Sequence, residues 1–494
     1  MSEVQILASV ETFLQRQHGH FIHGQHLEVD RRRIELINPA TEQVVSSIAV
    51  GNQQDVDAAV HSAHDAFLNA WANTSSYERG QKLNKLADLV EQHAEELAQL
   101  ETLTTGKLIH LARHLEVAQT AVFLRYFAGW ATKIHGQTMQ PSIPSMNGEK
   151  YTAYSIRQPV GVVAGIVPWN FSLMIGCWKI GSALTTGCTI VLKPSEFTTL
   201  SLLRLAELAI EAGIPAGVIN VVTGTGETGQ YLINANHIKK VSFTGSVPTG
   251  IAIGQQAMKN DLTRVSLELG GKNAAAILAD ANLDEILPTL LQATFVHQGQ
   301  VCAAPERFFV HQSKYDEFVE KVTGAIQQIK IGSPLDESSM FGPLSNQPHF
   351  EKVKHYLDIA NQNDQVICGG QVIQGTGYFV EPTLLKVQGI DDPLFIEETF
   401  GPVVDVIPFE SDDELIRMMN HSRFGLTASI WTNDLAKALR LIPQIEAGSV
   451  WVNMHTFLDP SVPFGGVKAS GLGREFSDAF IEDYTELKSV MIRY

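Results

Sequence analysis

Apolar residues recur at helical spacing between residues 52 and 133. Val56, Ala59, Val60 and Ala63 form one stripe, and a second stripe runs through 83–93. Because such stripes bury one side of a helix, they predict packed core helices and carry no functional signal. Before residue 50 the pattern shortens to runs at 19–24 and 34–39, which predict strands and turns.

Residues 161–271 alternate between short apolar runs and helical stretches. The run 161–167 is apolar throughout, as expected for a strand that is covered on both faces. Helices are predicted from Ser172 and over 200–212, where Gly213 and Pro215 end the second one. Further strands are predicted at 188–192, 218–222, 241–243 and 265–269. This order predicts an α/β fold with a doubly wound parallel sheet.

A second stretch of alternating helices and strands extends over 273–473. Its predicted strands include 275–278, 307–310 and 449–452. Two further segments, 151–156 and 487–492, alternate apolar and polar residues away from both stretches. They are predicted to be either simple edge strands or strands that bridge subunits.

Composition narrows the class of protein. The 494 residues carry a net charge of −17, which argues against a nucleic-acid partner. The four cysteines form no CxxC pair, so neither a disulfide scaffold nor a metal site is expected. The first 18 residues lack a secretory signal pattern, and no apolar run reaches the length of a membrane span. The sequence therefore predicts a cytoplasmic protein without a membrane partner.

A glycine pattern, GxGxxG, occupies residues 224–229. It is a weak signal, because no acidic residue follows about 20 positions later to hold a ribose. The strand 188–192 is a better candidate, since Lys193 and Glu196 follow it and a dinucleotide fold holds ribose hydroxyls with an acid at this strand end. A carboxylate there repels a 2′-phosphate, which favours NAD over NADP. A solvated ion pair is the alternative.

A second candidate for phosphate binding lies at residues 243–250. A predicted strand is followed by Gly245, Ser246 and a helix start that includes Gly250. Backbone N–H groups at such a helix start can bind a pyrophosphate. A structural glycine turn is the alternative.

Three polar residues are candidates for chemistry. Glu268 ends a predicted strand and could be a general base, or a solvated acid. Cys302 has small neighbours, which leave its sulfur approachable, although a lone cysteine is usually a small buried hydrophobe. Asn170 closes the first strand and could donate to an oxyanion.

An apolar stripe follows Asn170. Phe171, Met174 and Trp178 stand at positions i, i+3 and i+7, on one face of a helix. The stripe predicts either core packing or the wall of an apolar substrate tunnel.

Together these segments resemble the aldehyde dehydrogenase superfamily over essentially the whole chain. The resemblance rests on seven segments in order: 168–170, 193–196, 243–246, 268–272, 299–302, 397–402 and 463–475. The fold it implies has two doubly wound Rossmann-type domains and a small β element for oligomerisation. The implied bounds are 1–135 and 158–269 for an NAD-binding domain, 270–475 for a catalytic domain, and 136–157 and 476–494 for the oligomerisation element.

The resemblance also implies roles for individual residues. Cys302 would attack the aldehyde, Asn170 and the Cys302 N–H would hold the oxyanion, and Glu268 would activate the water that hydrolyses a thioester to the free acid. Lys179 and Glu475 would belong to a proton path from Glu268. The implied NAD-binding residues are Trp169, Lys193, Glu196, Gly245, Ser246, Gly250, Glu398 and Phe400.

The expected substrate is an arylacetaldehyde such as phenylacetaldehyde. The segments 89–103, 168–176 and 451–456 are most similar to family members that act on it. A broad-range, aliphatic or semialdehyde enzyme is the alternative, although no arginine in 455–462 could clamp a second carboxylate. A catalytically silent binding protein is an alternative of another class. The residues implied to bind substrate are Phe171, Met174, Trp178, Phe295, Val301, His455 and Phe464.

Two positions depart from the commoner family pattern. Ser172 stands where proline often follows the Asn-Phe pair, and residues 304–307 (Ala-Pro-Glu-Arg) replace a run with serine before the arginine. These departures concern the local loop geometry rather than the proposed reacting groups. The family implies a homo-oligomer, a dimer or a tetramer, built through the 151–156 and C-terminal strands.

Overall fold

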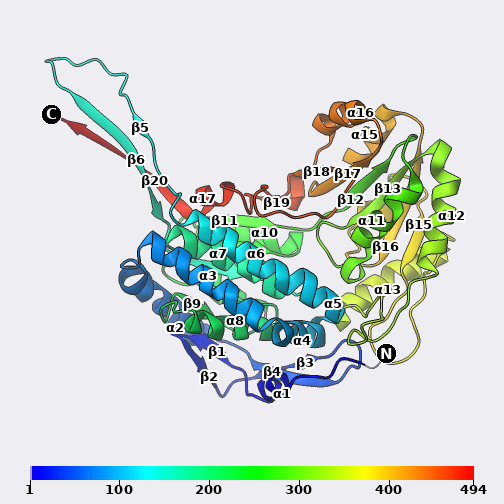
Figure 1. Ribbon diagram of the computed structural model, residues 1–494, viewed down its shortest axis with the longest axis horizontal. Coiled ribbons are helices and arrows are strands. Elements are labelled where there is room, and N and C mark those ends of the chain that lie inside the picture. The colour runs from blue at the N-terminus through cyan, green and yellow to red at the C-terminus, as the bar shows by residue number, and fades with distance from the viewer. Residues whose placement is uncertain (1–2) are drawn as a thin grey trace.

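The computed structural model describes residues 3–494, which fold around two large sheets and a small projecting one (Figure 1). The first sheet has eight strands. Five parallel strands form its centre, and β19, β1 and β2 add antiparallel edges. Its order is β19 (Gly471–Leu472), β11 (Arg264–Glu268), β10 (Ile238–Thr244), β7 (Val162–Ile166), β8 (Thr189–Lys193), β9 (Ile219–Val221), β1 (His20–Ile22) and β2 (Gln25–Leu27).

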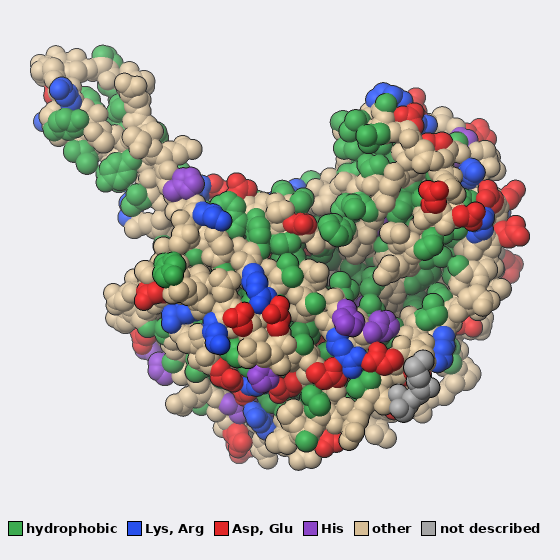
Figure 2. Space-filling view, in the orientation of Figure 1, with side chains coloured by type: hydrophobic (Ala, Val, Ile, Leu, Met, Phe, Trp, Pro, Cys, Tyr) green, Lys and Arg blue, Asp and Glu red, His purple; other side chains and the backbone are tan. Residues whose placement is uncertain are grey.

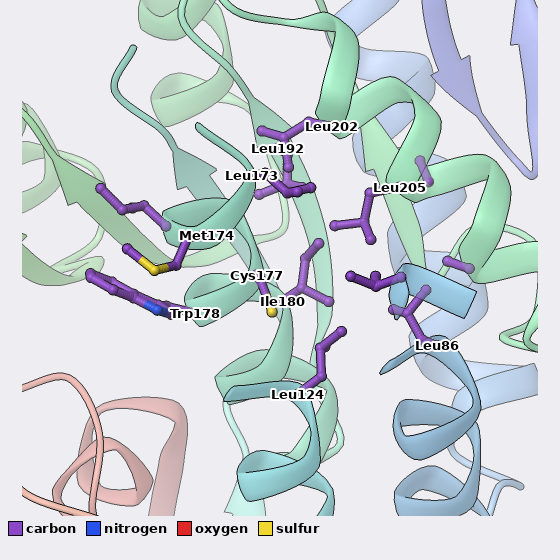
Figure 3. Close-up of a cluster of buried hydrophobic side chains, with 14 of the residues drawn as sticks. Leu86, Leu124, Leu173, Met174, Cys177, Trp178, Ile180, Leu192, Leu202 and Leu205 are labelled. Atoms are coloured by element: carbon purple, nitrogen blue, oxygen red, sulfur yellow. The ribbon is translucent and has the colours of Figure 1, made fainter. Parts of the chain in front are cut away.

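Both faces of this sheet are covered, because its central strands are apolar on both sides. Val163, Ile190 and Leu192 face the core formed with α3 (Ser76–Gln92), α6 (Ala118–Trp130), α7 (Ser172–Thr186) and α8 (Leu200–Glu211). Val162 and Val191 face a separate core with α2 (Gln53–Ala66), α9 (Gly226–Asn234) and α10 (Val247–Lys259). Figure 3 shows Leu173 and Ile180 of α7 on the side of the helix that meets Leu192, Leu202 and Leu205. The parallel sheet predicted from the apolar runs is confirmed.

The second sheet is built in the same way from seven strands, of which only the edge strand β14 is antiparallel. One face packs on α11 (Leu283–Phe295) and α12 (Tyr315–Ile326), and the other on α15 (Asp412–Asn420) and α16 (Leu435–Leu441). Its order is β14 (Val366–Cys368), β15 (Thr383–Lys386), β16 (Val403–Phe409), β13 (Pro305–His311), β12 (Asn273–Ile277), β17 (Thr427–Trp431) and β18 (Ser449–Val452).

The third sheet is an arm that leaves the body of the molecule (Figure 1). It joins β6 (Tyr151–Pro159) to β20 (Thr485–Arg493) on one side and to β5 (Thr138–Met139) on the other. The two segments with alternating pattern are therefore strands, and they pair with each other. A separate hairpin joins β3 (Arg33–Ile37) to β4 (Val44–Ala49).

The chain crosses back between these parts. Strand β19 lies within the segment that the family pattern groups with the second sheet, yet it pairs with β11 of the first sheet.

Among residues 3–494, no helix has the length and apolarity of a membrane span, and no group of three acidic, histidine or cysteine side chains is arranged to hold a metal. The remaining helices are α1 (Ala8–Leu14), α4 (Ala94–Thr105), α5 (Ile109–Leu111), α13 (Gln347–Gln362), α14 (Pro393–Ile396) and α17 (Ala479–Tyr484).

Candidate active site

Cys302 lies where two cavities meet. The first cavity has a volume of about 690 Å³ including its open mouth, and the second about 1380 Å³. Cys302, Asn170 and Ile175 line both of them. The space-filling view shows hydrophobic side chains gathered in the recess between the parts of the molecule that surround the two large sheets (Figure 2). A sulfur at this junction can contact a group in either cavity.

The topology of the first sheet places the first cavity. Strand order reverses between β7 and β10, and ligands bind outside the carboxyl ends of parallel strands at such a switch point. The segment after β7 brings Trp169 and Asn170 to the cavity, and the segment after β10 brings Gly245 and Ser246. Glu268 arrives at the end of the next strand, β11.

The loop that carries Cys302 is held from several sides. Asn273 Nδ2 donates to the carbonyl oxygens of Cys302 and Ala304, at 2.6 and 2.8 Å. Before it, His297 and Gln298 have φ angles of 48° and 57°, a left-handed conformation that costs side-chain-bearing residues free energy. Such strain persists where surrounding contacts fix it, as they do around this cysteine.

The thiol of Cys302 is partly accessible but mainly neutral. Burial, followed by the carboxylates of Glu268 and Glu398, raises its pKa above the usual value. Because the thiolate is the nucleophile, attack requires that a base takes the proton.

Glu268 lines the first cavity together with Cys302 and is a candidate for that base. It is buried, its Oε1 has no hydrogen-bond partner, and burial together with Glu475 raises its pKa well above the usual range. Behind it, Lys179 Nζ donates to Ser242 and Thr244 at 3.0 Å and lies 3.5 Å from Glu475 Oε1. The two residues expected in a proton path therefore form a buried ion pair, and both influence the charge state of Glu268.

Asn170 is fixed by one of its amide hydrogens. Its Nδ2 donates to the carbonyl oxygen of Gln300 at 2.8 Å, and the amide has a second N–H. Since Asn170 lines both cavities beside Cys302, its second N–H is a candidate donor to a developing oxyanion.

The first cavity has the features of a dinucleotide site. Helix α10 begins at its wall, and its cap residue Ser246 makes no side-chain capping bond, so the N–H groups of the first turn are free for an anion, except at Pro248, which has none. A side chain at Gly245 would stand 2.5 Å from the ring of Phe243, and one at Gly270 would stand 2.2 Å from a Glu398 oxygen. A side chain at either position would therefore displace the Phe243 ring or the Glu398 carboxylate.

Aromatic and charged groups complete the first cavity. The rings of Trp169 and Phe400 lie 5.5 Å apart and nearly perpendicular. Glu398 Oε1 accepts from Gly271 N at 2.7 Å, and burial and Glu306 raise its pKa to about 7.

The remaining residues expected at the cofactor lie outside the cavity lining. Lys193 Nζ donates to the Gly224 carbonyl oxygen at 3.0 Å and lies 3.7 Å from Glu196, at the end of β8 beside β7. Gly250 lies within α10 and packs against Leu269.

Two residues of this cavity have no counterpart in the sequence analysis. His349 and Lys352 reach it from α13. His349 Nε2 lies 2.7 Å from the Phe400 carbonyl oxygen, and Lys352 Nζ donates to the Glu398 carbonyl oxygen at 2.9 Å. No motif marks α13, so only the fold reveals them.

The second cavity is mainly apolar. Phe171, Met174, Trp178, Val301 and His455 line it, as expected of substrate-binding residues. Both ring nitrogens of His455 are engaged, with Ser429 Oγ at 2.7 Å and the Ala303 carbonyl oxygen at 2.9 Å. This histidine therefore supports the Cys302 loop as well as the wall.

The two other expected residues lie outside the lining. Phe295 packs against Phe341 in the core below the second sheet, and Phe464 stacks on Phe476. The loop after His455, which the sequence also indicates for substrate choice, adds Phe457 and Leu458 to the wall. The sequence did not single out the other members of the wall: Leu115, Gln119, Phe123, Gln292, Ala293 and Val296.

Comparisons with known proteins extend over nearly the whole chain. The aldehyde dehydrogenase family profile matches residues 26–490. A phenylacetaldehyde dehydrogenase from Pseudomonas fluorescens is 43% identical over 97% of each chain. An aldehyde dehydrogenase from Bacillus cereus, solved as an NAD⁺ complex, superposes with a TM-score of 0.95 at 40% identity over 99% of each chain. The betaine aldehyde dehydrogenase of Staphylococcus aureus, also with NAD⁺, gives 0.93 at 33% identity over 98% of this chain and 97% of that one.

These similarities cover both large sheets and the arm. They confirm the family expected from the sequence motifs and the α/β fold expected from the strand pattern. The chain therefore belongs to the aldehyde dehydrogenase family, whose members are oxidoreductases.

Proposed function

We propose that this protein oxidises an arylacetaldehyde, phenylacetaldehyde or a close analogue, to the free carboxylic acid with NAD⁺. The observation that carries the proposal is the position of Cys302 at the junction of a dinucleotide-like cavity and an apolar cavity. A phenyl ring suits the aromatic and aliphatic wall of the second cavity. The similarity to the Pseudomonas fluorescens enzyme supports the same substrate class.

The residues of the first cavity fit NAD⁺. The N-terminus of α10 would hold the pyrophosphate, Glu398 and, from beside the cavity, Lys193 and Glu196 would hold ribose hydroxyls, and Trp169 and Phe400 would flank the cofactor. When bound, the nicotinamide accepts the hydride that leaves the substrate carbon. Glu196 disfavours a 2′-phosphate by charge repulsion, which makes NAD⁺ the preferred cofactor.

The chain's own groups carry the covalent steps. Glu268 takes the Cys302 proton, and the thiolate adds to the aldehyde carbon to give a thiohemiacetal. Asn170 Nδ2 and the Cys302 N–H hold the oxyanion. After loss of hydride the substrate is a thioester, and Lys179 and Glu475 pass the Cys302 proton away from Glu268. Glu268 then deprotonates the water that attacks the thioester, and the thiolate that leaves takes this proton back from Glu268, which restores the thiol and releases the free acid.

Two further properties follow from the proposal. Cys302 must stay a free thiol, so a reducing compartment such as the cytoplasm suits the enzyme. The arm is proposed to join subunits into a dimer or tetramer, because Leu487 and Met491 of β20 are exposed apolar side chains on it. Light scattering of Met491→Glu tests this, and an unchanged mass would contradict it.

The proposal is tested by the rate of NADH formation. We expect the highest kcat/KM for phenylacetaldehyde among phenylacetaldehyde, acetaldehyde and succinate semialdehyde, and a lower value with NADP⁺. An equal or higher kcat/KM for either of the other aldehydes would exclude the aromatic assignment.

Two variants test the residue roles. Cys302→Ala should abolish oxidation, and full activity in this variant would disprove the nucleophile. Glu268→Gln should form NADH more slowly in a single turnover, because water must take the thiol proton in place of Glu268, and should then stall at the thioester. An unchanged steady-state rate would contradict the role of the base.

A further inference from the structure

A buried carboxylate lies behind the wall of the first cavity, at one of the positions where the sequence departs from the family pattern. Glu306 is on β13, four residues after Cys302, and 4% of it is exposed. We propose that Glu306 is a positioning residue that holds the loop Glu398–Phe400 in its cofactor-binding conformation and so sets the affinity for the dinucleotide. The inference rests on the proposed contacts of Glu398 and Phe400 with NAD⁺.

The hydrogen bonds of Glu306 converge on this loop. Its Oε2 accepts from Thr399 N at 3.0 Å and from Thr399 Oγ1 at 2.9 Å, and its Oε1 accepts from Phe400 N at 2.9 Å. An ionised carboxylate can accept all three, and bonds to a charged acceptor are about twice as strong as neutral ones. A single hydroxyl at this position could not satisfy three donors that point to two separate oxygens.

The loop needs such an anchor because its backbone is strained. Phe400 has a φ of 56°, a left-handed conformation that a residue with a bulky side chain rarely adopts. Lys352 and His349 of α13 contact the carbonyl oxygens of Glu398 and Phe400 on the other side. The N–H groups of the loop are thus bound by Glu306 and its carbonyl groups by α13, so the segment is fixed from both directions.

The charge of Glu306 is compensated within the protein. Lys272 Nζ donates to Glu306 Oε2 at 3.0 Å and lies 3.2 Å from Asp405 Oδ2. All three side chains are buried, and we call them the Lys272 cluster. Although burial opposes the charged form, Asp405 and Glu306 raise the pKa of Lys272, so the cation is retained beside Glu306.

The test uses cofactor binding rather than turnover. Glu306→Gln keeps the size of the side chain but places an N–H₂ group where an acceptor is needed, so fluorescence titration should give an NADH dissociation constant raised about tenfold or more. Hydrolysis of p-nitrophenyl acetate without cofactor, which needs Cys302 but not the loop, should stay within about twofold.

The matched control is Asp405→Asn. It perturbs the same cluster through Lys272 but touches no atom of the loop, so NADH affinity should stay near that of the wild type even if thermal stability falls. Equal losses of NADH affinity in Glu306→Gln and Asp405→Asn, or an equal loss of ester hydrolysis and NADH binding in Glu306→Gln, would show a general structural role and overturn the inference.

A milder variant covers misfolding of Glu306→Gln. Thr399→Val removes one donor to Glu306 and should weaken NADH binding several-fold. Unchanged affinity in a folded Thr399→Val protein would also overturn the inference.

Glu398→Gln separates the inference about Glu306 from the proposed ribose contact of Glu398. If it leaves NADH affinity unchanged, the ribose contact is wrong, and the inference then stands only if Glu306→Gln weakens binding through Phe400. If Glu398→Gln weakens binding and Glu306→Gln does not, the inference alone fails.

Discussion

Two buried lysines, each between two carboxylates, lie behind the walls of the two cavities. The Lys272 cluster supports the loop of the first cavity. Lys107, with Glu101 on α4 and Glu116 on a π-helical turn (Ala112–Val117), forms the corresponding Lys107 cluster behind the second. Glu116 Oε1 accepts from the N–H groups of Leu173 and Met174, at 3.1 and 3.3 Å, and Lys107 Nζ lies 4.1 Å from the Phe171 ring centroid.

The difference lies in what each carboxylate holds. Glu116 caps the first turn of α7, a helix whose own cap residue supplies no side-chain bond, so it satisfies donors that any helix start leaves free. Glu306 instead holds a loop that contains the left-handed residue Phe400. This loop has no regular secondary-structure hydrogen bonds that could replace those to Glu306. The Lys107 cluster should therefore affect mainly the stability of the protein and the wall of the second cavity. The Lys272 cluster should affect mainly the affinity for the cofactor.

The largest effect is expected from Lys107→Met. It leaves Glu101 and Glu116 buried without their cation, which costs about 3–5 kcal/mol in the free energy of unfolding. Urea denaturation followed by tryptophan fluorescence measures it. Lys354→Met is the control, because Lys354 is 45% exposed and its pairing with Glu351 at 3.9 Å contributes little. A loss below about 1 kcal/mol in Lys107→Met would remove the stability role of this cluster.

The second prediction concerns pH. Burial and Glu116 raise the pKa of Glu101 to about 8, so the folded protein keeps a proton that the unfolded chain releases above its ordinary carboxyl pKa. The wild type should therefore lose stability relative to Glu101→Gln as the pH rises from 5 to 8. The expected change is at least about 1.4 kcal/mol, the equivalent of one pKa unit. Parallel stability curves for the two proteins would contradict it.

The third prediction separates the two cavities. Glu116→Gln should raise the KM for the aldehyde about tenfold, because the first turn of α7 carries Phe171 and Met174 into the second cavity. Its NADH dissociation constant should stay within about twofold, the reverse of Glu306→Gln. If Glu116→Gln and Glu306→Gln both change the KM for the aldehyde, or both change the NADH dissociation constant, the two clusters do not act on separate cavities as proposed.

The smallest effect is expected from Ser201→Ala. Its hydroxyl donates to Glu101, and loss of this bond should cost about 1 kcal/mol in unfolding free energy. Ser182→Ala is a close control, since Ser182 is also buried in a helix but its hydroxyl makes no hydrogen bond. Equal costs for the two variants would show that the bond to Glu101 contributes nothing.

Much of the fold could be predicted from local patterns. Buried parallel strands are apolar on both faces, so runs such as 161–167 identified β7 and its neighbours. The family motifs lie at strand ends and in the turns that line the cavity. Their positions in the sequence therefore predict Trp169, Gly245, Glu268 and Glu398 as site residues. The structure places all four at the first cavity.

The rest depends on contacts between distant segments. Lys272 directly precedes β12 and Asp405 lies on β16, 133 residues later, so no spacing in the sequence links them. Phe295 and Phe464 show a second limit of the sequence. A phenylalanine near Cys302 in the sequence can face either a cavity or the core, and the residue type does not tell which. Orientation of that kind is decided by packing, which the sequence does not display.

Strand β19 has a consequence for how the chain is made. Glu268 pairs with Gly471, roughly 200 residues later, and ribosomes add about 5–20 residues per second. For about 10–40 seconds the edge of β11 therefore has no partner strand. Cys302 is synthesised within this interval, whereas Glu475, the partner of Lys179, follows only after β19. A nascent chain thus contains Cys302 before the Lys179–Glu475 ion pair can form, and the outer edge of β11 is open to mispairing with another strand throughout this interval.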